Sequence, residues 1–133
     1  MKAGPLSILA LALGLLMVSG PLFAHHGAAA YETGKQVTVQ GTVTEFKFIN
    51  PHCEIFVDVK DATGKVEKWI GELGGVTGLS RTGWTKSLVK PGDQITLIGN
   101  RPKNGANALR LQKVVLSNGK EFNFERGEDY AGR

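Results

Sequence analysis

The chain has 133 residues, with 16 lysines and arginines against 12 aspartates and glutamates, and one cysteine. The net charge of +4 is too modest to indicate a nucleic-acid-binding protein. A single cysteine excludes an internal disulfide, so the core must stabilise the fold.

The first 24 residues have the three parts of an export signal. Lys2 supplies a positive charge, residues 6–18 are apolar or small, and Ala24 ends a stretch suited to cleavage. The apolar run is shorter than the ~20 residues that a bilayer requires. We therefore expect export to the periplasm, cleavage after Ala24, and no stable membrane anchor after cleavage.

The rest of the chain predicts one domain. Residues 25–35 are expected to be a flexible N-terminal segment, residues 36–126 a barrel, and residues 127–133 a loose C-terminal tail. Apolar and polar residues alternate from Val37 to Val43, which predicts a first strand within residues 36–49. Gly41 indicates a bend or bulge in that strand.

A turn at Asn50-Pro51-His52-Cys53 leads into a second alternating strand at residues 54–60. Residues 61–64 form a hairpin turn before a third strand at residues 66–73. Residues 74–93 predict one or two helical turns followed by a tight turn. Strands at residues 94–101, 109–116 and 121–124 complete the chain, the last two joined by an Asn-Gly turn.

This order of elements predicts a mainly β protein. Five to six strands with one short helical insertion between the third and fourth resemble a small OB-like β-barrel, preceded here by a signal-peptide helix. A fold of this class does not fix a function.

Five sequence stretches carry a family resemblance: AHHG, GTVTEFKFINPH, WIGELGG, LSRTGWTKSLVKPGD and PKNGANA. Together they resemble an exported bacterial family of unknown function, DUF6152. The family's motifs match at His25, His26, Asn50, Pro51, His52, Gly83, Trp84, Thr85, Pro91, Gly92 and Asp93. The resemblance implies export and a small single domain, and it implies no established activity.

Two of the three histidines, His25 and His26, directly follow the expected cleavage site. An N-terminal histidine offers one metal ion both its α-amino group, with a pKa of about 8, and its imidazole, with a pKa of about 6.5. Nitrogen-rich tetragonal sites favour Cu(II), and Ni(II) to a lesser extent. The arrangement resembles the histidine brace of exported copper proteins. The alternative is a pair of solvated histidines that bind nothing.

His52 is expected to point outward from its strand. Strand alternation places His52 and Glu54 on one face and Cys53, with the apolar residues that follow it, on the other. Cys53 is therefore a predicted core residue. His52 and Glu54 would add a nitrogen and an oxygen to the metal site if the N-terminus folds back over them. The alternative is a histidine that hydrogen-bonds the backbone of its own turn.

A second kind of site is predicted from aromatic and cationic residues. Trp84 is expected to plug the barrel end, with a pocket wall as the alternative. A ligand face for a small anion, a glycan or a protein partner would combine Trp84, Arg81, Lys86, Phe46, Phe48 and Phe56.

No spacing in the chain indicates a catalytic triad or a phosphate-binding loop, so we expect a binding protein and not an enzyme. The favoured function is an exported periplasmic protein that binds a transition metal, copper above all, through His25, His26, His52 and Glu54. The alternative is a metal-free OB-like binding module. Export and the modest charge argue against a nucleic-acid partner.

Overall fold

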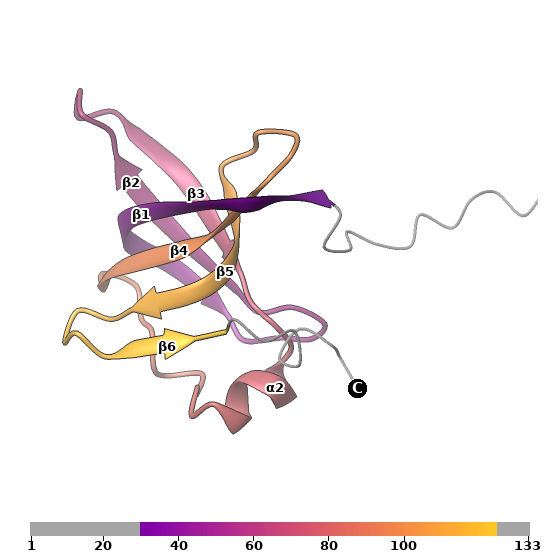
Figure 1. Cartoon of the computed structure of the whole chain (residues 1–133). Coiled ribbons are helices and arrows are strands. Elements are labelled where there is room, and N and C mark those ends of the chain that lie inside the picture. Colours follow the sequence, from indigo (N-terminus) through magenta and orange to yellow (C-terminus); the bar gives the residue numbers. More distant parts are fainter. Residues whose placement is uncertain (1–29, 125–133) are drawn as a thin grey trace, which may run out of the picture.

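The structure, a computed structural model, describes residues 30–124 (Figure 1). The predicted signal peptide, His25, His26 and the C-terminal tail lie outside the described residues. In chain order the elements are β1 (Tyr31–Lys47), β2 (Glu54–Lys60), β3 (Val66–Glu72), α2 (Val76–Arg81), β4 (Gln94–Pro102), β5 (Ala108–Val115) and β6 (Glu121–Asn123).

The strands form one sheet that closes into a ring. Its order is β3-β2-β1-β4-β5-β6, with antiparallel neighbours throughout. A parallel pairing of β3 with β5 closes the ring, and β6 extends beyond it along β5. The helix α2 lies in the connection between β3 and β4 (Figure 1). The predicted small OB-like β-barrel with one helical insertion is confirmed.

Alternating side chains fill the barrel. Ile55 and Val57 of β2 face Leu97 of β4 and Leu109 and Leu111 of β5, and all five are at most 1% exposed. Cys53 is also fully buried, while its neighbour His52 is exposed. The prediction that Cys53 points into the core and His52 points outward is confirmed. Adjacent residues of an extended chain point to opposite faces.

The first strand begins earlier than its alternation predicts. Tyr31 pairs with Pro102, and the register shifts before Gln36 pairs with Asn100. The prediction of a flexible segment up to residue 35 is therefore wrong for Tyr31–Lys35. These residues lack apolar alternation, so their place depends on contacts made by Tyr31 with distant parts of the chain.

Two glycines allow strands to approach closely. A Cβ atom on Gly41 would lie 2.8 Å from the carbonyl oxygen of Asp58, and one on Gly99 would lie 2.1 Å from that of Arg110. The β4–β5 register shifts at Gly99, whereas the β1–β2 register shifts between Val43 and Glu45. The predicted bulge in β1 exists, but it falls beyond Gly41.

The segment after β3 closes one end of the barrel. The side chain of Trp84 is 1% exposed, and its ring centroid lies 5.6 Å from that of Phe46, 5.1 Å from Phe122 and 5.9 Å from Phe124. The predicted plug is confirmed. Within residues 30–124, no helix is long and apolar enough to cross a membrane.

Candidate functional site

The Asn-Pro-His turn is fixed by contacts at both of its ends. The Asn50 side-chain oxygen accepts a hydrogen bond from the Val76 backbone N–H at 2.9 Å, at the start of α2. The Cys53 N–H donates to the Gly74 carbonyl at 3.1 Å, and the Leu73 N–H donates to the Cys53 carbonyl at 2.8 Å. The turn is therefore tied to the end of β3 and the start of α2, and His52 is held between these two attachments.

The imidazole of His52 lies against the carboxylate of Glu72. Its Nδ1 atom lies 3.4 Å from Glu72 Oε1, and the two side chains are 45% and 28% exposed. Within residues 30–124, the structure gives the imidazole no hydrogen bond to the backbone of its own turn. The geometry therefore favours an accessible side chain with one nitrogen facing a carboxylate over a turn-capping histidine.

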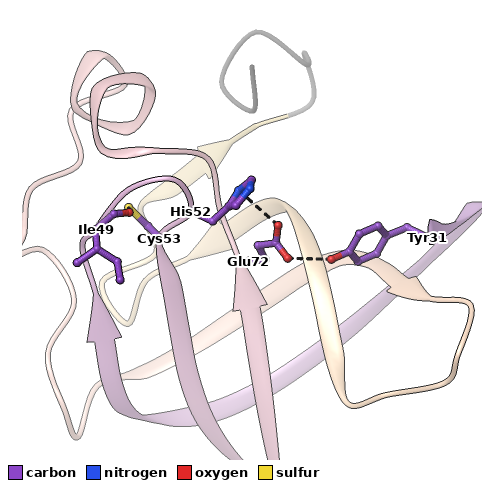
Figure 2. Close-up of polar contacts among 5 residues, drawn as sticks. All are labelled: Tyr31, Ile49, His52, Cys53 and Glu72. Carbon is purple, nitrogen blue, oxygen red and sulfur yellow. Dashed lines mark hydrogen bonds and ion pairs between the residues drawn. The ribbon is translucent and has the colours of Figure 1, made fainter. Parts of the chain in front are cut away.

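Glu72 also contacts the start of β1. The Tyr31 hydroxyl donates a hydrogen bond to Glu72 Oε2 at 2.8 Å, so Glu72 lies between Tyr31 and His52 (Figure 2). Burial, and then the bond to Glu72 and its charge, raise the pKa of the half-buried Tyr31 to about 12. We call Tyr31, His52 and Glu72 the surface triad.

The carboxylate that lies against His52 belongs to Glu72, and not to the predicted Glu54. Glu54 and Glu72 are register partners on β2 and β3, but the carboxylate that reaches His52 is that of Glu72. The hairpin turn at residues 61–64 could have indicated Glu72. A turn that pairs Lys60 with Val66 also pairs Glu54 with Glu72, which puts both carboxylates on the face of His52. Glu54 as an oxygen donor stays a prediction.

The surface triad does not amount to a complete metal site. Within the described part of the chain, no group of three or more histidine, cysteine, aspartate or glutamate side chains is arranged to hold a metal ion. A metal bound at His52 would therefore need ligands from elsewhere, and the predicted ligands His25 and His26 precede Tyr31 by only a few residues.

The predicted ligand face does not form. Trp84 is buried in the plug, and Phe46 and Phe48 pack against the core. Phe46 pairs with the buried Ile55 and so faces the interior, whereas Phe56 lies on the outer face with the Lys47 ammonium 4.5 Å from its ring centroid. Arg81 and Lys86 are exposed near the plug. The aromatic members of the set lie on opposite faces of the sheet and cannot bind one ligand together.

One solved structure with a similar fold is the mitochondrial single-stranded DNA binding protein Rim1 from S. cerevisiae. The match has a TM-score of 0.48 and 9% sequence identity, and it covers 62% of this chain and 93% of that chain. The expectation that nucleic acid is not a partner is corrected: export and a modest net charge do not by themselves exclude one. The likeness adds nothing further about what this chain binds.

Among curated proteins, none matches the chain in sequence. A family model matches residues 12–110, which include the histidine pair, the Asn-Pro-His turn and all three residues of the surface triad. The chain therefore belongs to the family of unknown function DUF6152.

Proposed function

We propose that this is an exported periplasmic protein that binds a transition metal, with copper favoured, between its processed N-terminus and His52. The proposed ligands are the amine and imidazole of His25 and the imidazoles of His26 and His52, with Glu54 as a further oxygen donor. The observation that carries the proposal is the exposed His52, fixed against Glu72 at the place where β1 begins.

The other family-motif residues in the described chain have clear structural roles, whereas His52 does not. Asn50 binds the start of α2, and Trp84 fills the barrel end. Asp93 accepts a hydrogen bond from the Lys90 N–H at 2.9 Å in the turn before β4. His52 is 45% exposed, and ion pairs between exposed groups contribute little to stability. A ligand gives His52 a purpose that the fold does not.

The length of chain before Tyr31 is compatible with a shared site. Six residue steps separate His25 from Tyr31, and an extended chain covers at most ~3.3–3.6 Å per step, or roughly 20 Å. Tyr31 itself is bonded to the carboxylate that contacts His52. The N-terminal histidines are therefore tethered within reach of His52, which keeps their effective concentration at that site high.

The donor atoms favour copper on chemical grounds. An N-terminal amine with two or three imidazoles makes a nitrogen-rich set, for which Cu(II) has the highest affinity among divalent first-row metals. Cleavage would create the amine ligand, because the precursor has an amide nitrogen at residue 25. A protein that gains its site only on export suits a carrier or buffer of copper in the periplasm.

The test compares two N-termini. We expect protein that begins at His25 to bind Cu(II) roughly tenfold or more tightly than the same protein with its α-amino group acetylated, because acetylation removes the chelating amine. Isothermal titration of both proteins against a competing chelator, with each N-terminus verified by mass spectrometry, measures the difference. Equal affinities would show that the histidine pair gains nothing from cleavage.

A matched substitution tests the other side of the site. His52→Ala should weaken Cu(II) binding by a similar factor while leaving the thermal unfolding midpoint nearly unchanged, since the side chain is exposed. The control is Thr38→Ala, another exposed residue, which should change neither quantity. If His52→Ala leaves the copper affinity unaltered, the Asn-Pro-His turn is not part of the metal site.

A further inference from the structure

We infer that Glu72, held in place by Tyr31, fixes His52 in the tautomer with its proton on Nδ1 and its lone pair on Nε2. The inference rests on the proposed function in one respect: it makes Nε2 the atom that binds the metal. Glu72 and Tyr31 are then positioning residues that act through His52.

The contact of His52 with Glu72 selects the tautomer. A neutral imidazole has one N–H donor and one acceptor nitrogen, and an ionised carboxylate can only accept. Since Nδ1 lies 3.4 Å from Glu72 Oε1, the proton is favourable on Nδ1 and a lone pair there would face a negative oxygen. The lone pair is therefore left on Nε2, as in metal sites where the histidine donates its other N–H to a carboxylate.

Tyr31 restrains the carboxylate. Its hydroxyl donates to Oε2 at 2.8 Å, so the two oxygens of Glu72 are divided between Tyr31 and His52. Figure 2 shows the Glu72 side chain between these two partners, with each dashed contact ending on a different oxygen. The guanidinium carbon of Arg110, the register partner of Glu72 on β5, lies 6.0 Å from the Tyr31 ring centroid. This places a cation at the ring of Tyr31.

The parts of the surface triad come from three separate segments. Tyr31 begins β1, His52 lies in the turn before β2, and Glu72 ends β3. An isolated ion pair on a surface needs no third residue, and its geometry is usually loose. Here one carboxylate oxygen is hydrogen-bonded to a tyrosine 41 residues away, and the other lies 3.4 Å from His52 Nδ1. A carboxylate held in this way can orient a ligand side chain.

The tautomer can be measured on metal-free protein. Long-range proton–nitrogen correlation spectra, recorded at a pH where the imidazole is neutral, should show His52 mainly in the Nδ1–H form. Glu72→Ala should shift His52 toward the Nε2–H form, and Tyr31→Phe should shift it partly. The matched control is Glu54→Ala, which removes the partner carboxylate of the same β2–β3 pair and should leave the tautomer unchanged.

Two outcomes of the tautomer measurement would overturn the inference: a mainly Nε2–H His52 in the unaltered protein, or equal shifts in Glu54→Ala and Glu72→Ala. If Glu72→Ala protein does not fold, Tyr31→Phe still tests the inference, because this variant keeps the ring and removes only the hydroxyl. A tautomer that Tyr31→Phe leaves unchanged would then overturn the inference.

Copper binding separates this inference from the proposed function. Tyr31→Phe should weaken Cu(II) binding about tenfold, the lower end of the range for residues that orient a ligand, without changing the number of nitrogen ligands in the electron paramagnetic resonance spectrum. Tight copper binding that Tyr31→Phe and Glu72→Ala both leave unchanged overturns the inference alone. Failure of the unaltered protein to bind copper, with His52 still in the Nδ1–H form, overturns the proposed function and supports the tautomer assignment.

Discussion

Tyr31 shows how one side chain can attach the start of a strand to a distant turn. It lies where the sequence predicts a flexible segment, yet its hydroxyl is bonded to Glu72. Burial and the adjacent carboxylate both disfavour the phenolate, and they raise the pKa of Tyr31 to about 12.

This raised pKa predicts a change of stability in alkaline solution. The folded-state pKa of about 12 exceeds the ordinary value of 10, so the stabilising effect is complete below pH 10 and is lost as the pH rises through 12. In Tyr130→Phe protein, which keeps Tyr31 as its one tyrosine, the near-ultraviolet phenolate absorbance should report this titration. Glu72→Gln should bring the midpoint closer to 10.

A Tyr31 midpoint near 10 in folded protein, unmoved by Glu72→Gln, would contradict the bond between the two side chains. The free energy of unfolding should follow the same titration. Its loss should be smaller in Tyr31→Phe protein, which has no hydroxyl to ionise.

Among the elements, the short helix and the Trp84 plug carry the clearest prediction for stability. The backbone N–H of Trp84, three residues after α2, donates to the Leu79 carbonyl at 3.1 Å. The Trp84 ring is enclosed by phenylalanines of β1, β6 and the residue after β6. Trp84→Ala should lower the free energy of unfolding by ~3–5 kcal/mol, because it leaves a cavity and removes both apolar burial and aromatic contacts. Urea denaturation measures the loss.

The matched control for the plug is Phe56→Ala, an aromatic truncation on the outer face of β2. Phe56 is only partly buried, so its truncation should cost well under half as much. Equal losses for the two variants, or a loss under about 1 kcal/mol for Trp84→Ala, would mean that Trp84 does not close the core.

The elements were predictable where local pattern determines them. Alternation identifies β2, β3 and β5, and the turn residues at 61–64 and 117–120 identify the hairpins. The first five residues of β1 were not predictable, because their place depends on Tyr31 and on pairing with Pro102, both of which are tertiary contacts.

At the scale of the whole molecule, closure of the barrel assembles the surface triad. Residue types and strand parity predicted an exposed His52 and a buried Cys53, and both were confirmed. Parity could not choose between Glu54 and Glu72, which share one outer face and differ in their distance from the turn. That choice requires the β2–β3 register together with the path of the turn that connects β1 to β2.

The proposed metal site, like the surface triad, combines residues from separate segments of the chain. The proposed ligands His25 and His26 precede β1, and His52 lies between β1 and β2, so the proposed site requires both segments. The central claim is therefore that a single copper ion contacts the processed N-terminus and His52 at the same time.

Electron spin-echo envelope modulation of Cu(II)-loaded protein that begins at His25 tests this claim most directly, because the remote nitrogen of each bound imidazole modulates the echo. We predict that His52→Ala removes the contribution of one imidazole, and that acetylating the α-amino group of His25 changes the remaining nitrogen couplings in both proteins. A spectrum that His52→Ala leaves unaltered would contradict the claim, since copper would then be held without the barrel.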